Sequence, residues 1–254
     1  MAGVRGPEPD AGPATDEDLQ AFGDSFRQTL CAQMRTHGVR PSETVLMIDC
    51  SRADIWRREI NPDYKATRQT PSDFAPNVFG YFHAVLLPDL VQSLGVHAVS
   101  CPRAEADDIA HVLCRWASTR DKRVIVITGD ADLAQLAVPG RVRVLDIKGA
   151  CVLEKACKKA GCCLDGGTYL EIKVLQGDKG DNVLPVRPRM GPKSALRLVN
   201  DPAALAKELT DDAVRARYEE NRVMVDLSRM PEDISAEIDA RLCAQLPEAC
   251  LSKE

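Results

Sequence analysis

Carboxylate side chains recur in this sequence where segments that read as strands come to an end. Asp49 ends the apolar run 44–48, and Asp130 and Asp132 follow the apolar run 124–128. Because the carboxyl ends of parallel strands meet at one edge of a sheet, we expect these three side chains to converge there. Further acids occupy a helix start and a glycine-rich loop: Glu105, Asp107, Asp108, Asp178 and Asp181.

These eight carboxylates, gathered in one cleft, would repel one another and stay protonated unless cations neutralised them. Hard oxygen ligands in that number suit Mg²⁺, for which Mn²⁺ can substitute. Two such ions a few ångströms apart are the usual means of in-line displacement at a phosphodiester. The carboxylates therefore predict a two-metal site for phosphodiester hydrolysis.

Structural interpretations of each acidic motif stay open at this point. An Asp-x-Asp pair after a strand is often only a helix cap, and an acidic helix start favours the helix dipole. The calcium-loop pattern is missing. A phosphatase of the Asp-x-Asp type is weakly supported, because its nucleophile would be followed by Thr or Val, whereas Leu133 follows Asp132.

The distribution of charge favours a nucleic acid as the partner. The net charge is −5, but the residues outside the eight acids carry a small positive sum. Two basic segments flank the acidic ones: Arg52, Arg57, Arg58, Lys65 and Arg68, then Lys173, Lys179, Arg187, Arg189, Lys193 and Arg197. Cations at the reaction centre with Lys and Arg on flanking phosphates are what a metal-dependent nuclease needs. Either basic segment alone could be a solvated face.

Hydrophobic periodicity predicts the elements that position these residues. Strands and helices alternate in the first part of the chain: helix 16–37, strand 44–48, helix 77–94, strand 96–100, helix 104–118, strand 124–128, a short helix and strand 142–147. Such alternation predicts an α/β fold with a mainly parallel central sheet flanked by helices.

Beyond residue 150 the pattern is helical apart from the Gly/Pro-rich loop 177–192. The expected helices are 168–176, 192–199, 202–209, 211–227 and 232–246. We therefore divide the chain into a disordered tail over 1–15, an α/β core over 16–150 and a helical region over 151–254.

The cysteines and the lack of long apolar runs predict an intracellular protein that does not enter a membrane. Four of the ten cysteines lie over 151–163 without a C-x-x-C pair. That spacing argues against a zinc site, and unpaired thiols are expected in a reducing compartment.

Taken together, three motifs resemble the acidic blocks of the 5′-nuclease superfamily, which includes flap endonucleases and the 5′→3′ exonuclease domain of DNA polymerase I. They are Glu105-Ala106-Asp107-Asp108, the block 128–136 and Gly177-Asp178-Lys179-Gly180-Asp181-Asn182. Segments 48–49, 56–59, 64–68, 217–226 and 234–238 resemble most the ribonuclease H of T-even phages. The match spans roughly 16–246 with the blocks in order, which is more specific than any single motif.

This resemblance implies a PIN-like core and a metal-dependent hydrolase of 5′ ends on duplex DNA: flaps, nicks, RNA primers and RNA/DNA hybrids. It implies a role in replication or repair, in the cytoplasm or nucleus or as a virus-encoded protein in its host cell. A sliding clamp or a single-strand-binding protein is the partner that the resemblance implies besides DNA.

The resemblance also implies roles for individual residues. It assigns Glu105, Asp107, Asp130, Asp132 and Asp181 to two divalent ions, directly or through water, with Asp49 beside them, and Asp108 and Asp178 to the outer shell. Lys65 and Arg68 resemble the cations of a basic arch that stabilise the developing phosphorane charge. Arg57, Arg58 and Tyr64 would contact DNA.

A helix-hairpin-helix-like element is implied at the start of helix 192–199, where Gly191 and Lys193 would grip a phosphate together with K⁺. The first glycine of the usual Gly-x-Gly is replaced by Arg189. Plain helix initiation by Gly-Pro is the alternative interpretation.

The N-terminus departs from the family pattern. Members begin with a strand that ends in an aspartate, whereas residues 1–15 contain no apolar strand and Asp10 has no such context. We therefore expect a core without the first strand and a first metal site with one carboxylate fewer. Two hypotheses follow: an active two-metal 5′-nuclease, or a catalytically impaired homologue that binds branched DNA as a structural or regulatory protein.

Overall fold

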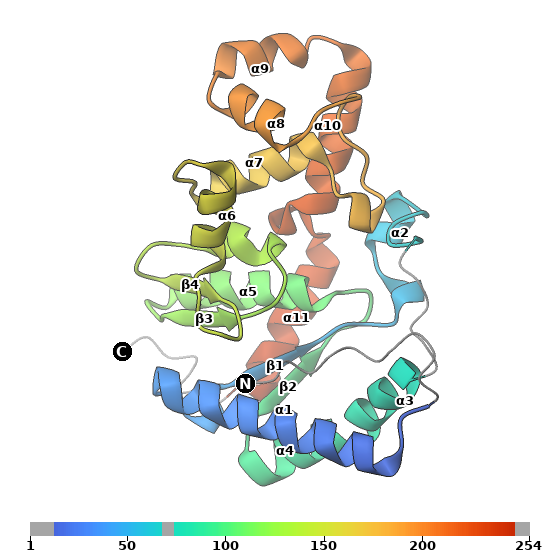
Figure 1. Ribbon diagram of the computed structural model, residues 1–254, viewed down its shortest axis with the longest axis vertical. Helices are drawn as coiled ribbons and strands as arrows, with labels where there is room; N and C mark the ends of the chain where they lie inside the picture. The colour runs from blue at the N-terminus through green and yellow to red at the C-terminus, as the bar shows by residue number, and fades with distance from the viewer. Residues whose placement is uncertain (1–12, 68–73, 247–254) are drawn as a thin grey trace. The chain divides into compact units, whose positions relative to one another are not determined.

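The computed structural model describes residues 13–67 and 74–246 and divides into two compact units (Figure 1). The first unit comprises residues 1–46 and 69–98, and the second comprises 47–68 and 99–254. The expected disordered tail lies mostly outside the described residues, as do Asp10 and Arg68.

The first unit is built on the long helix α1 (Asp16–His37). Thr15 caps its start, because the hydroxyl accepts a hydrogen bond from the Asp18 amide at 3.2 Å, and Gly38 ends it in the left-handed conformation. A second helical run follows as α3 (Phe74–Tyr81), the π-helical turn η3 (Phe82–Leu86) and α4 (Leu87–Leu94). The core of the first unit contains Met34, Leu86, Leu90 and Val96. Both helices predicted for this part are present, together with the short η1 (Pro41–Glu43).

The four predicted strands are confirmed within one or two residues. β1 (Val45–Ile48) pairs with β2 (His97–Ser100), and β3 (Val124–Ile127) pairs in parallel with β4 (Val142–Leu145). The described residues thus form two two-stranded sheets where we expected one continuous sheet. The fold class is as predicted, an α/β arrangement with parallel strands and many helices.

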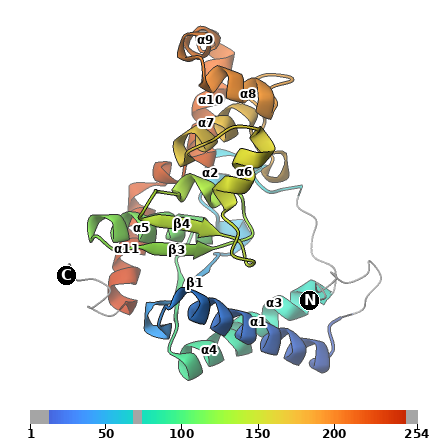
Figure 2. The same ribbon diagram turned by 60° about the vertical axis from the view of Figure 1, so that its left-hand side comes forward.

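Helices make up most of the second unit, and α5 lies beside β3 and β4 (Figure 2). They are η2 (Arg52–Asp54), α2 (Arg57–Ile60), α5 (Ala106–Thr119), η4 (Asp132–Leu136), α6 (Val152–Ala160), α7 (Gly166–Gln176), η5 (Lys179–Asp181), α8 (Pro192–Val199), α9 (Pro202–Glu208), α10 (Asp212–Val225), η6 (Leu227–Arg229) and α11 (Glu232–Gln245). Helices α7 to α11 match the five helices predicted beyond residue 150 within two residues at each end. The sequence interpretation missed α2 and α6, which are short.

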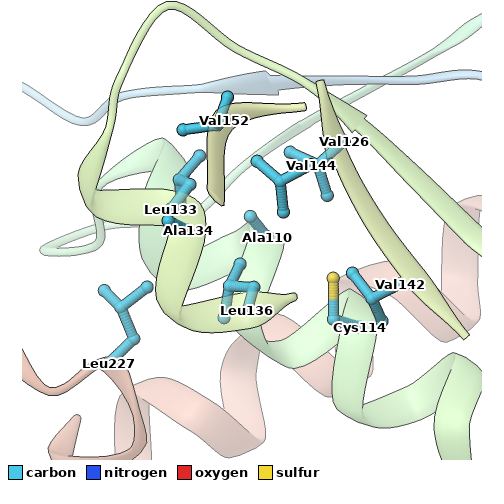
Figure 3. Packing of buried hydrophobic residues seen from close by; sticks show 10 residues of the cluster. All are labelled: Ala110, Cys114, Val126, Leu133, Ala134, Leu136, Val142, Val144, Val152 and Leu227. Carbon is cyan, nitrogen blue, oxygen red and sulfur yellow. The ribbon is translucent and has the colours of Figure 1, made fainter. Parts of the chain in front are cut away.

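A core of buried apolar side chains lies around β3 and β4 (Figure 3). It joins α5, β3, η4, β4, α6 and η6 through Ala110, Cys114, Val126, Leu133, Ala134, Leu136, Val142, Val144, Val152 and Leu227. Burial raises the pKa of the Cys114 thiol to about 12, so this cysteine behaves as a small hydrophobic residue. The segment that carries Asp132 is thereby fixed to the same core as β3.

Among the described residues no helix is long and apolar enough to cross a bilayer. The cysteines of the described segments are free thiols, including those over 151–163.

Shortening Leu133 to alanine tests how firmly this core holds η4. Leu133 is 3 % exposed, so Leu133→Ala should lower the free energy of unfolding by about 2–5 kcal/mol. Leu184→Ala is the control, since Leu184 is 59 % exposed and its truncation should cost no more than about 0.5 kcal/mol. Urea unfolding measures both, and equal effects would contradict this packing.

Candidate functional site

The start of α5 gathers four of the predicted acids. Glu105 caps the helix and forms a capping box with Asp108, whose carboxylate accepts a hydrogen bond from the Glu105 amide at 3.0 Å. Asp49, at the end of β1, accepts a hydrogen bond from the Ala106 amide at 2.7 Å. The end of β1 thus meets the start of α5, and Asp107 lies on the first turn of that helix.

Arg57 is buried against this helix start. Its Nη1 and Nη2 atoms donate to Asp108 at 3.0 and 2.8 Å, and Nη1 also donates to Glu105 at 2.8 Å. Trp56 Nε1 donates to Asp108 at 3.1 Å. Asp108 is fully buried, and both of its oxygens accept hydrogen bonds from these donors.

The turn after α2 brings Tyr64 and Lys65 to the same place. The Tyr64 hydroxyl lies 3.2 Å from Glu105 Oε2 and 3.3 Å from Asp181 Oδ2. Lys65 forms ion pairs with Glu105 and, at 3.9 Å, with Asp181. Its backbone amide donates to the Asp181 carbonyl, and its φ of 57° is in the left-handed region. This turn joins the start of α5 to the glycine-rich loop.

The loop itself needs a glycine at its entry. Gly177 has a φ of 69°, and a Cβ there would come within 2.4 Å of the Val183 carbonyl oxygen. Asp178 then accepts a hydrogen bond from the Gly180 amide at 2.7 Å and sets the short turn η5 that carries Asp181. The tight turn holds both aspartates of the third acidic block directly after the end of α7.

Lys173, on α7, connects this loop to the acids after β3. Its Nζ lies 2.9 Å from Asp132 and 2.6 Å from Asp178. The Tyr169 hydroxyl, one turn earlier, lies 3.3 Å from Asp132. Asp130 accepts a hydrogen bond from the Asp132 amide at 2.8 Å, which holds the two aspartates in one turn.

The electrostatics show that the separate acids influence one another. Burial, Asp130 and Glu105 raise the pKa of Asp107 to about 7, so the charge of Asp130 in the second acidic block acts on Asp107 in the first. Burial also raises the pKa of Asp132 against the opposing charge of Lys173. Burial alone would also raise the pKa of Asp178. The hydrogen bond and charge of Lys173 outweigh burial there, so the pKa of Asp178 is lowered.

Within the described part of the chain, no group of three His, Cys, Asp or Glu side chains is arranged to hold a metal ion. Lysine ammonium groups lie between the carboxylates instead. Lys65 pairs with Glu105 and Asp181. Lys173 pairs with Asp132 and Asp178. These two lysines thus connect side chains of the three acidic blocks in pairs and supply the positive charge between them.

Two residues predicted to contact DNA are placed differently. The side chains of Arg57 and Tyr64 are 2 % and 5 % exposed, because their polar atoms bind the carboxylates described above. They cannot reach a phosphate from there. Arg58 is partly exposed and donates to the carbonyls of Arg52 and Pro62.

The predicted helix-hairpin-helix-like element begins at Gly191, the N-cap of α8, with Lys193 exposed on the first turn. Arg189 has a φ of 63°, a conformation that glycine adopts more readily. The loop therefore keeps a left-handed residue at the position where the usual glycine is missing.

Sequence reasoning missed Tyr169 as a site residue and counted Lys173 only among the basic flanks. Their spacing of four residues puts them on one face of α7, one turn before the acidic loop. That spacing was the only sign available in the sequence.

Comparisons with known proteins agree with this arrangement. The family model described as "5'-3' exonuclease, N-terminal resolvase-like domain" matches residues 19–161. A DNA polymerase I of Thermus thermophilus is 30 % identical over 84 % of this chain and 26 % of its own length. A 5'-3' exonuclease of Streptomyces coelicolor is 30 % identical over 66 % of this chain and 58 % of its own. The chain therefore spans about a quarter of the polymerase relative.

Solved structures share the fold. A T5 5'-exonuclease with bound zinc has a TM-score of 0.69, at 17 % identity, and covers 89 % of this chain and 92 % of its own. A bacteriophage T5 flap endonuclease in a pseudo-enzyme-product complex with DNA and metal ions has a TM-score of 0.64, at 16 % identity, over 89 % and 91 %. The family model and the polymerase relative, together with this fold, define the 5′-nuclease class. This chain belongs to the 5'-3' exonuclease family, N-terminal resolvase-like domain.

The raised pKa of Asp107 predicts a pH dependence of stability in the absence of divalent ions. Between the unfolded value near 3.9 and the folded value of about 7, the folded protein holds a proton that the unfolded chain lacks. The free energy of unfolding should therefore fall as pH rises through this window, by up to about 1.4 kcal/mol per pH unit.

Asp107→Asn removes this contribution. In EDTA, the variant should gain stability relative to the wild type as the pH is raised from about 5 to 8. Urea unfolding at several pH values measures the difference, with Asp24→Asn on the exposed side of α1 as control. Parallel pH profiles for wild type and Asp107→Asn would contradict the assignment.

Proposed function

We propose that this chain is a divalent-metal-dependent 5′→3′ exonuclease and flap endonuclease. Its substrates are phosphodiesters at 5′ ends of DNA or RNA primers on duplex DNA. The observation that carries the proposal is the meeting of three acidic blocks, far apart in the sequence, around Lys65 and Lys173. Family membership and the T5 structures with metal ions and DNA support it.

The residues present fit divalent ions in their chemistry. Carboxylate oxygens are the ligands that Mg²⁺ prefers, and two ammonium groups already mark where positive charge is needed. Glu105, Asp107, Asp130, Asp132 and Asp181 would hold the ions, with Mn²⁺ as a substitute for Mg²⁺, and Asp49 and Asp178 would lie close by. When bound, such ions supply an activated water and stabilise the developing negative charge.

The chain's own residues prepare the site for this chemistry. The Tyr64 hydroxyl, with one proton to donate, lies within hydrogen-bond distance of both Glu105 and Asp181, and the Lys173 ammonium group reduces the repulsion between Asp132 and Asp178. Lys65 places an ammonium group at the carboxylates, where a scissile phosphate would approach. Arg68 would add a second cation of this kind. Gly191 and Lys193 would hold a phosphate of the duplex, with K⁺ at the start of α8.

A second candidate function is a homologue that binds branched DNA without turnover. It is favoured by the two lysines, which already neutralise carboxylates that divalent ions would need. Recruitment by a sliding clamp or single-strand-binding protein stays a prediction from the resemblance.

Replacing Asp130 tests the proposed chemistry. With Mg²⁺ or Mn²⁺, the wild type should cleave a 5′-labelled flapped duplex and a 5′-RNA/DNA hybrid, and Asp130→Asn should lower kcat by about 100-fold or more. The matched control is Asp146→Asn. Asp146 also follows a parallel strand, but it accepts hydrogen bonds from the Lys148 and Ala150 amides and pairs with Lys155.

Cleavage that survives Asp130→Asn would refute the two-metal assignment. DNA binding by the wild type without any cleavage would favour the second candidate function. An equal loss in Asp146→Asn would show that the effect is structural.

A further inference from the structure

Arg57 is the most deeply buried cation that contacts the acidic blocks in the described residues. The side chain is 2 % exposed, and its guanidinium lies 4.4 Å from the centre of the Trp56 ring. Nε donates to the Met224 carbonyl at 2.9 Å, while Nη1 and Nη2 bind the two carboxylates at the start of α5. A DNA phosphate cannot reach this group, so its role must be exerted through its partners.

The two carboxylate oxygens of Glu105 have different partners. Oε2 accepts from Arg57 Nη1 at 2.8 Å and from the Tyr64 hydroxyl at 3.2 Å. Oε1 is left to the Lys65 ammonium group. Two donors on one oxygen restrict rotation of the carboxylate, and the other oxygen faces Lys65, which is more exposed than Arg57.

The partner Asp108 holds Arg57 in turn. Its two oxygens receive both terminal nitrogens of the guanidinium, a fork that a lysine cannot reproduce because its ammonium is a single point charge. Arg57 is thus oriented by Asp108 and Met224 before it binds Glu105.

We propose that Arg57 is a positioning residue for the proposed metal site: its fixed guanidinium orients Glu105 so that Oε1 is presented to a divalent ion. The proposal rests on the proposed function, because it concerns the ion that Glu105 would bind. Arg57 itself touches neither the ion nor the DNA.

A purely electrostatic role for Arg57 makes the opposite prediction. A nearby positive charge repels a divalent ion, so its removal would tighten ion binding. Loss of positioning weakens ion binding, because residues that orient metal ligands typically change metal affinity or activity about 10–100-fold. The sign of the change therefore separates the two roles.

Arg57→Lys is the first test, since it keeps the charge and removes the fork. Isothermal titration with Mn²⁺ should show an affinity about 10–100-fold weaker than that of the wild type. On a flapped duplex, kcat at fixed Mn²⁺ should fall, while DNA affinity in EDTA stays within about threefold. Arg115→Lys is the matched control on α5, because Arg115 pairs with Asp239 and Ser235 away from the acids.

A second variant covers the case in which Arg57→Lys does not fold. Arg57→Met combined with Asp108→Asn removes both members of the buried pair, which is milder than leaving one charge unpaired. Urea unfolding confirms that the variant is folded. Weaker Mn²⁺ binding by the folded double variant supports positioning, since the variant loses one positive and one negative charge and leaves the net charge near the site unchanged.

Unchanged or tighter Mn²⁺ binding in either folded variant would overturn the proposal, as would a wild type that binds no Mn²⁺. A wild type that binds Mn²⁺ but does not cleave would count against the proposed function alone. The positioning role would then still be decided by the ion affinities.

Discussion

Ion pairs between three cations and the acidic side chains are the interactions on which the second unit depends. Arg57 binds Glu105 and Asp108 at the start of α5. Lys65 and Lys173 each connect carboxylates from two distant segments. Burial alone raises the pKa of a carboxyl, as it does at Asp107 and Asp132, so acids in this setting need nearby positive charge to stay ionised.

The three cations are not equivalent, and the difference divides the acids into two groups. Arg57 is enclosed and has its nitrogens bound to fixed partners, so Asp108 is committed to structure. The lysines are more exposed, at 15 % and 11 % of the side chain, and each ends in a compact charge on a flexible stem. A divalent ion could replace an ammonium group of this kind without dismantling the helix start.

Much of this site could be predicted from the sequence, because strand ends and short motifs carry local information. Asp130 and Asp132 follow a run of apolar residues, and parallel pairing of β3 with β4 gives that run its direction. The sequence identified Gly177 only as part of a glycine-rich loop, and the structure adds that its left-handed φ and close neighbours admit no side chain.

The roles of Arg57 and Tyr64 could not be predicted in the same way. Both lie in a polar, proline-broken segment that reads as exposed, and only tertiary packing buries them against α5. Arg189 shows the converse: a residue that departs from the motif adopts a left-handed conformation, which glycine adopts more readily. Composition reports neither burial nor backbone conformation at a single position.

We expected a boundary at residue 150, where the pattern changes from alternating strands and helices to helices alone. The contacts instead divide the chain into residues 1–46 with 69–98 and residues 47–68 with 99–254. Gln135, beside the acidic turn, donates to the Val225 carbonyl at 3.2 Å and accepts from the Leu227 amide at 3.1 Å. Arg57 binds the Met224 carbonyl from the other side. The end of α10 is thus fixed to both acidic segments, and α7, which packs on α8 and α10, carries Lys173. A duplex held at α8 would therefore have a defined position relative to the carboxylates, because one compact unit contains both.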